Sequence, residues 1–361
     1  MKHRFSFLQL NPTLSTLAAV ASFIAFSAAA FAASAKGVQV VPNEAQRRVD
    51  ITIDGAPFTS YIWPTTLKKP VLYPLINGDG VTITRGYPLE QRSGERVDHP
   101  HHAGLWFNYA KVNGFDFWNN SEAIKPENRA KMGTILHTKI VSAKSGPKQG
   151  ELVVESIWIT GENKQIITET TRYIFSLRKG ARVIDQDVSL KALDHVVFAD
   201  EKDGLLGLRV ARWLESPAEK GGIFMDSNGN PTKVDAVPAD AANPATGVYL
   251  TSEGKTGEAV WGTRGRWCSL TGHTGDHTAT IAMFDQPNNP AYPTYWHARG
   301  YGLFALNPLA PSIFDAKHPP LNLTLDKGQS INFRYRVMLY SRTATPDELN
   351  RESDAFLAES K

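Results

Sequence analysis

The sequence has little cysteine, little net charge and, after its N-terminal region, no long apolar run. Cys268 is the only cysteine among 361 residues, so no disulfide can form within the chain, and we expect its thiol to be a small buried apolar group. The formal net charge is +3, which gives no electrostatic reason to expect nucleic acid as a partner. Stability must therefore come from an apolar core, and the chain is long enough to form one.

The sequence also lacks the motifs of several common catalytic sites. It has no Walker loop, no G-x-G-x-x-G after a strand pattern, no H-E-x-x-H and no G-x-S-x-G. Nucleotide cofactors and serine-hydrolase chemistry are therefore not expected. We predict no cofactor, with a divalent metal held by histidines as the alternative.

The N-terminus has the pattern of an export signal. Lys2 and Arg4 give it a basic start, an alanine-rich apolar run follows, and Ala30-Phe31-Ala32 fits a cleavage site. We predict a signal peptide over residues 1–32 and a single domain over residues 33–361. The mature protein would be periplasmic or secreted, without a membrane partner. A retained membrane anchor is the alternative, although the apolar run is short for a span.

Most of the remaining sequence alternates as antiparallel strands do. Val49, Ile51 and Ile53 alternate with polar residues, as in a half-buried strand, and the segment 331–339 alternates most clearly. Short turns join three further candidate strands into a meander: Glu151–Thr160, Gln165–Leu177 and Ala181–Leu190. The 28 glycines and 22 prolines favour many turns over long helices. We predict an all-β fold, a large antiparallel β-sandwich.

One helix is expected, at the C-terminus. Thr345 can cap it, Pro346 suits the first helical position, and Glu348 completes a capping box. Its apolar face, which would pack on a sheet, consists of Leu349, Phe356 and Leu357.

The stretch 221–257 is poor in large apolar residues and exceeds the length of an ordinary connection. Such a stretch is either a lid over a site or a solvated insertion.

Three of the ten histidines lie within four positions, at His99, His101 and His102. Pro100 favours an extended backbone at His99, and an extended segment would place His99 and His101 on one face and His102 on the other. Such imidazoles can transfer protons, bind a divalent metal, or donate hydrogen bonds to sugar hydroxyls while Trp106 or Trp118 stacks on the sugar ring. The alternative is a tight turn whose histidines are satisfied by backbone carbonyls.

Further polar groups accompany this cluster. Glu95 and Asp98 can orient the imidazoles, whereas their alternative role is pairing with nearby arginines on the surface. Asp203 lies beside a flexible glycine and can be a base or a turn residue, and Arg209, in an apolar run, needs an acidic partner or a bound anion. A distant cluster combines amides, an imidazole, a guanidinium and aromatic rings, which is typical of sugar recognition; it includes Asn288, Trp296, His297, Arg299, Tyr301 and Asn307.

The motifs together resemble the bacterial PmoA-like family. The segments that carry the resemblance are Pro70–Leu75, Gly94–Trp106 with its D-H-P-H-H, Gly114–Trp118, Trp296–Gly302 and Phe333–Arg336. The name refers to a methane oxygenase whose membrane subunit is built of long apolar helices, which this chain lacks, so methane oxidation is not expected. The resemblance implies a sandwich of the galactose-mutarotase type. There a histidine acid and a carboxylate base exchange protons with a sugar; D-H-P-H-H would supply the histidine, and the carboxylate is not placed.

These observations predict an exported carbohydrate-active protein that transfers protons on a sugar or glycoside, by mutarotation, hydrolysis or elimination. The predicted catalytic residues are His99, His101, His102, Glu95 and Asp203. The predicted residues that bind the small-molecule or oligosaccharide substrate are Arg96, Trp106, Arg209, Asn288, His297, Arg299 and Asn307.

Two alternatives stay open. One is a non-catalytic carbohydrate-binding module, and the other is a metal-dependent oxygenase or lyase with His99, His101 and a third ligand such as His297. The leading hypothesis requires that the segments near residues 100 and 300 share one cavity.

Overall fold

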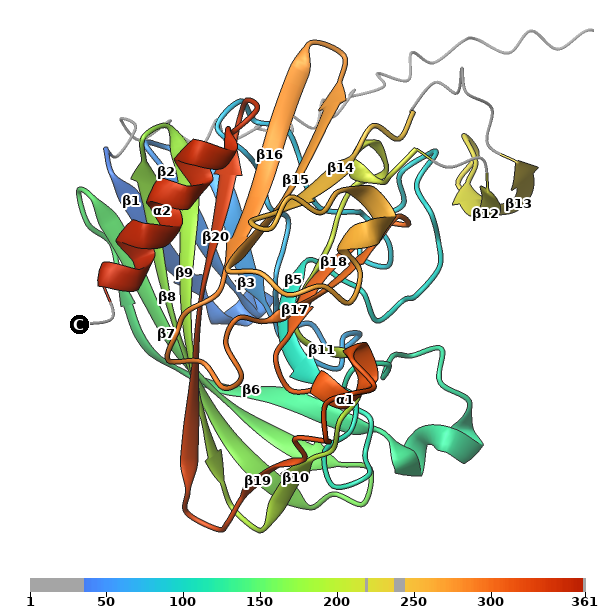
Figure 1. Cartoon of the computed structure of the whole chain (residues 1–361), viewed down its shortest axis with the longest axis vertical. Helices are drawn as coiled ribbons and strands as arrows, with labels where there is room; N and C mark the ends of the chain where they lie inside the picture. Colours follow the sequence, from blue (N-terminus) through green and yellow to red (C-terminus); the bar gives the residue numbers. More distant parts are fainter. Residues whose placement is uncertain (1–35, 218–219, 237–243, 360–361) are drawn as a thin grey trace, which may run out of the picture. The chain divides into compact units, whose positions relative to one another are not determined.

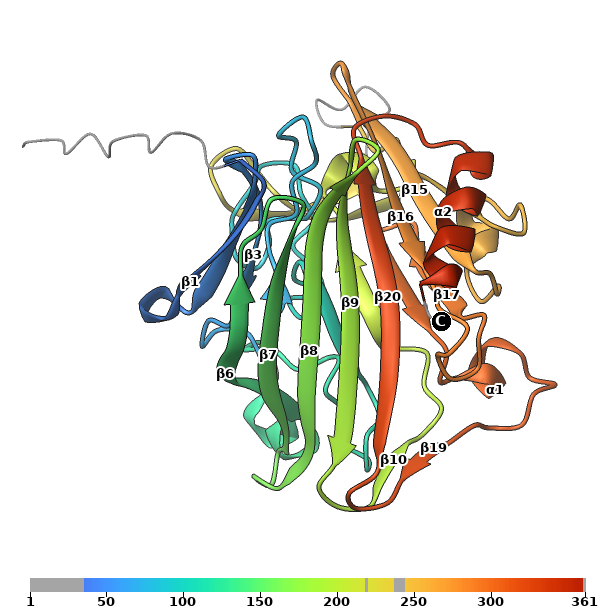
Figure 2. The ribbon, with the colours of Figure 1, turned by 90° about the vertical axis from the view of Figure 1, so that its left-hand side faces the viewer.

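Two large antiparallel sheets make up most of the described chain. The computed structural model describes residues 36–217, 220–236 and 244–359. The first sheet has the strand order β1-β2-β3-β4-β5-β11-β18-β17, and the second has the order β14-β15-β16-β20-β9-β8-β7-β6 (Figures 1 and 2). Two short pairs, β10-β19 and β12-β13, lie outside these sheets. The predicted signal peptide lies outside the described residues, within which no helix has the length and apolarity to span a bilayer.

The strands of the first sheet are β1 (Val38–Asn43), β2 (Arg48–Ile53), β3 (Ala56–Ile62), β4 (Val71–Leu72), β5 (Leu105–Tyr109), β11 (Gly204–Arg209), β17 (Tyr295–Arg299) and β18 (Leu303–Asn307). Those of the second sheet are β6 (Gly133–Lys144), β7 (Gln149–Thr160), β8 (Gln165–Arg178), β9 (Ala181–Ala192), β14 (Val248–Thr251), β15 (Trp267–Thr274), β16 (His277–Phe284) and β20 (Ser330–Tyr340). The short pairs are β10 (Val196–Phe198) with β19 (Leu323–Leu325), and β12 (Lys220–Met225) with β13 (Pro231–Ala236). The α-helices are α1 (Pro311–Phe314) and α2 (Pro346–Ala358), and 3₁₀ turns span Glu44–Gln46, Pro126–Lys131, Arg212–Leu214 and Gly257–Val260.

The core lies between the two sheets. Phe107 of β5 packs on Phe333 of β20 with ring centroids 5.6 Å apart, and both rings are buried. Along β2, buried and partly exposed residues alternate as expected. The meander of β7, β8 and β9 also forms as predicted. The prediction of an all-β antiparallel sandwich with a C-terminal helix is therefore confirmed.

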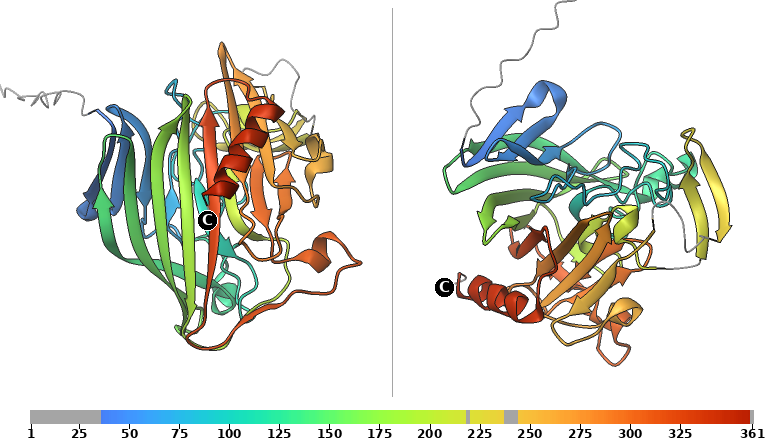
Figure 3. Two further views of the ribbon diagram at one scale, coloured as in Figure 1. Left: turned by 60° about the vertical axis from the view of Figure 1, so that its left-hand side comes forward. Right: turned by 90° about the horizontal axis from the view of Figure 1, so that it is seen from above.

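The helix α2 covers part of the second sheet (Figure 3). Leu349 and Phe356 are buried in one cluster with Met338 and Tyr340 of β20. This cover explains why β20 alternates only over its first half and is buried on both faces afterwards. The Thr345 side chain caps the helix by accepting from the Glu348 N–H. Glu348 itself pairs with the Arg342 guanidinium, so no reciprocal capping bond is formed.

The register of the first sheet places polar side chains on its outer face, away from the second sheet. On β11, Leu206 and Leu208 belong to the core, so Gly207 and Arg209 point outward. Gly207 stands in register with Trp106 of β5, and a side chain there would meet the Trp106 ring at 2.6 Å. Only glycine therefore lets this indole lie flat against the sheet.

Two neighbouring strands extend this outer face. Leu303 of β18 pairs with Arg209 on one side and with Arg299 of β17 on the other, so the two arginines share one cross-strand row. The next outward row contains His297 beside Ala305. Residues that are far apart in the sequence are thus gathered by strand order alone.

Candidate functional site

The three histidines near residue 100 form a turn rather than an extended strand. The His102 N–H donates to the His99 carbonyl at 2.9 Å, and His99 has a positive φ of 44°. The expected extended backbone and its alternating faces are therefore wrong. Instead the rings of His99 and His102 stack in parallel with centroids 4.9 Å apart, and the His101 ring stands edge-on to His102 at 4.3 Å.

The buried guanidinium of Arg85 holds this turn. It donates to the backbone carbonyls of Asp98, His99 and His102 at 2.9–3.0 Å. Its side chain is 0% exposed. Burial, followed by the charge of Arg209, lowers the pKa of Arg85 to about 9. The turn is thus fixed by side-chain hydrogen bonds, which outweigh the extended preference of a residue before proline.

Asp98 is the acidic partner that Arg209 was predicted to need. Its Oδ1 accepts from Arg85 Nη1 and from Arg209 Nη2, each at 2.7 Å, and lies 3.2 Å from His99 Nδ1. Burial raises the pKa of Asp98, but the hydrogen bond from His99 and the charges of Arg209 and Arg85 outweigh it and hold that pKa well below its usual range. The carboxylate stays ionised and orients the His99 ring.

Aromatic stacking joins this turn to the segment near residue 300. The Tyr301 ring lies parallel to the His99 ring with centroids 5.0 Å apart, and the His102 ring stacks on Trp106 at 5.3 Å. The Arg209 guanidinium lies 4.9 Å from the Tyr301 ring centroid. The two distant sequence clusters therefore meet, as the leading hypothesis requires.

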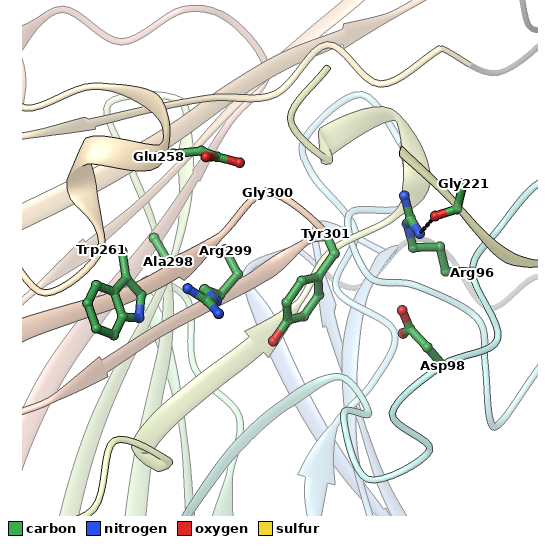
Figure 4. Close-up of a pocket in the computed structure, with 9 residues that line it drawn as sticks. All are labelled: Arg96, Asp98, Gly221, Glu258, Trp261, Ala298, Arg299, Gly300 and Tyr301. Carbon is green, nitrogen blue, oxygen red and sulfur yellow. Dashed lines mark hydrogen bonds between the residues drawn. The ribbon is translucent and has the colours of Figure 1, made fainter. Parts of the chain in front are cut away.

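A pocket opens where they meet, and we refer to it as the Trp261 pocket (Figure 4). Its volume is about 510 Å³, and residues of three segments, 96–98, 258–261 and 298–301, line it together with Gly221. Gly221 belongs to the long stretch 221–257, and its carbonyl accepts from Arg96 Nη1 at 3.2 Å. That stretch thus supplies part of the pocket wall through the β12-β13 hairpin.

The pocket carries one exposed indole among polar groups. Trp261 is 36% exposed, and the Arg299 guanidinium lies 5.5 Å from the centroid of its ring. Figure 4 shows the Glu258 carboxylate and the Tyr301 hydroxyl on other sides of the same hollow. An indole face combined with carboxylate, guanidinium and phenol groups can cover the C–H face of a sugar and bond its hydroxyls.

His101 lines a different cavity, which we refer to as the Lys69 cavity. Its volume is about 450 Å³, and its walls include Lys69, Tyr87, Pro100 and Asn120. Burial, followed by the charge of Lys69, lowers the pKa of His101 to about 2. The histidine turn therefore stands between two cavities, with Asp98 on one side and His101 on the other.

Three predicted substrate-binding residues have their main contacts within the protein. Arg96 lines the pocket but bonds Glu215 through its Nε at 2.8 Å. Trp106 and Arg209 are 2% and 0% exposed, so neither offers its surface to a ligand. The indole that can stack on a sugar is Trp261, whereas the sequence suggested Trp106 or Trp118, and Trp118 is only 1% exposed.

Glu95 is not among the residues that line the Trp261 pocket. Its Oε2 accepts from the Gly86 N–H at 2.6 Å, and burial, as the main cause, raises the pKa of its carboxyl group. The structure thus places Glu95 as a buried acceptor within the connection between β4 and β5.

Asp203 and His297 come together, but outside the Trp261 pocket. Asp203 Oδ1 lies 3.8 Å from His297 Nδ1, which donates to the Lys202 carbonyl at 3.1 Å. Asp203 also bonds Lys202 Nζ at 2.7 Å. Burial, as the main cause, lowers the pKa of His297 to about 4.

The two predicted asparagines lie elsewhere. Asn288 lines a cavity beside β8, β9 and β20 of the second sheet. Asn307 is buried and donates to the carbonyls of Glu201 and Lys202 at 2.7 and 3.1 Å. The structure does not bring either to the Trp261 pocket.

A metal ligand set is not found in the described part of the chain. No group of three or more histidine, cysteine, aspartate or glutamate side chains there is arranged to hold an ion. The imidazoles of His99 and His101 stand edge to face, and His297 Nδ1 is directed to a backbone carbonyl. This arrangement provides no ligand set for the metal-dependent alternative.

Four residues of these sites were missed from the sequence: Lys69, Arg85, Glu258 and Trp261. Lys69 follows another lysine and resembles a surface residue, and Arg85 lies in an unremarkable Thr-Arg-Gly segment. Trp261 could have been noticed as a tryptophan in a Gly-rich stretch, but nothing local places it beside Arg299.

The fold and the site define a β-sandwich protein with an open polar pocket on the outer face of one sheet. Residues 48–354 match the family described as "Family of unknown function (DUF6807)", and the chain belongs to that family. The match does not support the PmoA-like name that the motifs suggested. No curated protein matches the sequence.

Several solved structures are similar to this chain. The GH36 alpha-galactosidase AgaB from Geobacillus stearothermophilus is 11% identical with a TM-score of 0.41, and the alignment covers 84% of this chain and 41% of the galactosidase. The galactose 1-epimerase from Lactobacillus acidophilus NCFM is 11% identical with a TM-score of 0.37, covering 85% and 98% of the two chains. A putative aldose 1-epimerase from Escherichia coli K12 is 10% identical with a TM-score of 0.35, covering 84% and 99%.

The chain thus spans about two fifths of the length of the galactosidase and nearly all of the epimerases. At these identities and TM-scores, the likeness identifies no substrate or reaction for this chain.

Proposed function

We propose that the Trp261 pocket binds a carbohydrate and that His99 transfers a proton on it, in a mutarotation, hydrolysis or elimination. The observation that carries the proposal is an exposed indole lining the same pocket as Asp98, Glu258 and Arg299. Sugars present alternating C–H faces and hydroxyl edges, which this combination matches. The pocket volume of about 510 Å³ is within the range of small-molecule sites.

The roles of the pocket residues follow from their charges and contacts. Trp261 stacks on the apolar face of the sugar ring. Asp98, kept ionised by two guanidiniums, can only accept hydrogen bonds, whereas Arg299 can only donate them. The Tyr301 hydroxyl does either, so the pocket holds both donors and acceptors for hydroxyl groups.

His99 is the proton-transfer group of this proposal. Its side chain is 42% exposed, and its Nδ1 lies 3.2 Å from Asp98 Oδ1. A carboxylate at Nδ1 keeps the proton on that nitrogen, so that Nε2 is left to accept and return a proton. His99 is not among the residues that line the pocket, but it contacts Asp98 and stacks on Tyr301, and both of these residues line it.

The other two imidazoles of the turn are less suited to this chemistry. His102 Nδ1 lies 3.3 Å from Arg209 Nη1, and because a guanidinium only donates, the His102 proton is on Nε2. Burial and the neighbouring positive charges hold the pKa of His102 well below its usual value. His101 lines the Lys69 cavity instead.

We also propose that the protein works outside the cytoplasm, in the periplasm or as a secreted protein. This part rests on the signal pattern of residues 1–32 alone.

The test combines sugar binding with anomeric turnover. A panel of mono- and oligosaccharides is screened by calorimetry and by NMR for anomer exchange, chain cleavage or unsaturated products. With an accepted sugar, Trp261→Ala is expected to weaken binding roughly tenfold. His99→Gln is expected to lower the rate by about 10²-fold or more while binding is kept.

The chain offers a matched control for His99. His195 is another exposed histidine paired with a carboxylate, its Nδ1 lying 3.0 Å from Asp326 Oδ1. His195→Gln should leave binding and rate unchanged. Sugar binding without turnover in the wild type would reduce the proposal to a binding module, and no binding by any sugar would remove it.

A further inference from the structure

The Lys69 cavity contains a buried amine without an acidic partner. Lys69 is 4% exposed and lines this cavity of about 450 Å³. Its Nζ donates to the His101 carbonyl at 2.6 Å and lies 5.1 Å from the centroid of the Trp106 ring. No described carboxylate lies within ion-pair distance of Nζ. A buried ammonium in such surroundings is costly, because its lost hydration is not replaced by an opposite charge.

The charged groups around Lys69 do not supply that partner. The carboxylate of Glu122 lines the same cavity but pairs with Lys68. Asp116 acts only at longer range and raises the pKa of Lys69. Arg85, close to the His101 side of the cavity, adds a further positive charge to the same region. The surroundings therefore favour the neutral amine.

Burial is the main reason that the pKa of Lys69 is lowered to about 7. A lysine desolvated in this way is a nucleophile near neutral pH, whereas an ordinary lysine is almost fully protonated there. The walls of the cavity combine apolar residues such as Leu67, Val71 and Leu89 with the polar side chains of Asn120 and Ser121.

We infer that the Lys69 cavity is a binding site for a small aldehyde or ketone, which Lys69 captures as an imine. The neutral Nζ attacks the carbonyl carbon and gives a carbinolamine. The carbinolamine then loses the hydroxyl group from carbon and the remaining proton from nitrogen as one water molecule, leaving a C=N bond. No oxidant or reductant takes part, and hydrolysis reverses the step. Asn120 and Ser121 line the same cavity and give it polar side chains beside the captured compound.

The experiment uses the full-length protein with glycolaldehyde as probe and cyanoborohydride to trap the imine. Peptide mass spectrometry then locates the hydroxyethyl group on each lysine. Lys68 is the matched internal control, since it is the adjacent residue and is paired with Glu122. Lys69 is expected to be labelled roughly tenfold or more faster than Lys68 at pH 7. Its labelling rate should rise with pH and level off above about 7.

Lys69→Met provides the second arm, because methionine fills a similar apolar volume without a charge. This variant should lose the fast-labelled position and keep carbohydrate binding in the Trp261 pocket, while Trp261→Ala should leave Lys69 labelling unchanged. Failure of the two proposals is therefore distinguishable. Labelling of Lys69 no faster than that of Lys68 overturns the inference. So does tight binding of glycolate that depends on Lys69 without imine trapping, which would make the cavity an anion site.

Discussion

At the scale of single residues, the site has few carboxylates to balance the charges of its buried arginines. Arg85 and Arg209 are both 0% exposed, and among the described residues Asp98 is the one carboxylate that pairs with both of them. Two like charges held this close repel each other unless an anion lies between them. Asp98 therefore has two duties, since it neutralises the arginines and orients His99.

Asp98→Asn is expected to destabilise the fold by about 3 kcal/mol, because it leaves two buried guanidiniums without their anion. Urea unfolding followed by tryptophan fluorescence measures the change. Asp326→Asn breaks the exposed pair of Asp326 with His195, and it should change the free energy of unfolding by less than about 0.5 kcal/mol. Equal stabilities of Asp98→Asn and the wild type would show that the guanidiniums do not need Asp98.

At the scale of elements, α2 is an accessory layer on the second sheet. Its apolar residues Leu349 and Phe356 bury one face of β20, and its first turn is capped by Thr345. The Glu348 carboxylate is bound by Arg342 instead of returning to the cap. The cap thus rests on one hydrogen bond, which the Thr345 side chain accepts from the Glu348 N–H.

Thr345→Ala should lower the free energy of unfolding by about 1 kcal/mol through loss of this cap. Thr343→Ala serves as the control, because Thr343 is exposed and lies just before the helix. Thermal unfolding of both variants decides the matter. The same Tm for Thr345→Ala and Thr343→Ala would mean that packing alone holds α2.

At the scale of the whole molecule, buried imidazoles make stability depend on pH. Burial is the first cause of a lowered pKa at His101, His137 and His297, to about 2, 4 and 4. The unfolded chain has the ordinary histidine value of about 6.5. Below that pH the unfolded state binds more protons than the folded one, so stability falls as the pH falls from 6.5 towards these folded values.

The free energy of unfolding is therefore expected to decrease between pH 6.5 and pH 4.5, by roughly 1.4 kcal/mol per pH unit for each such histidine once the pH is well below 6.5. His101→Asn should reduce this slope by about the contribution of one histidine. His195→Gln should leave the slope unchanged, because His195 is exposed. Urea unfolding at several pH values measures the slope. A slope that His101→Asn does not alter would place the protonation elsewhere.

More of the fold than of the site can be predicted from the sequence. The alternation of Val49, Ile51 and Ile53 and the cap at Thr345 are local patterns, and local physics decides them. The pocket depends instead on β11, β18 and β17 lying side by side, which brings Arg209 and Arg299 into one row. No pattern within a short segment encodes that adjacency.

The prediction of an extended backbone at His99 was wrong for a related reason. The preference of a residue before proline predicts an extended His99, but three carbonyls of the segment bind Arg85, which comes from outside the motif. Lys69 shows the same limit, because its burial is decided by residues far along the chain. The chemistry of D-H-P-H-H is visible in the sequence, but the residues that hold this segment in place are not.

The burial of Cys268 in β15 has a practical consequence. The chain has no other cysteine, and this thiol is shielded from dissolved reagents. A cysteine introduced at the exposed Ser227, in the turn between β12 and β13, would be the single thiol that a maleimide dye can reach. Because Gly221 of the same hairpin lines the Trp261 pocket, the emission of such a dye could follow ligand entry without removal of any native residue but Ser227.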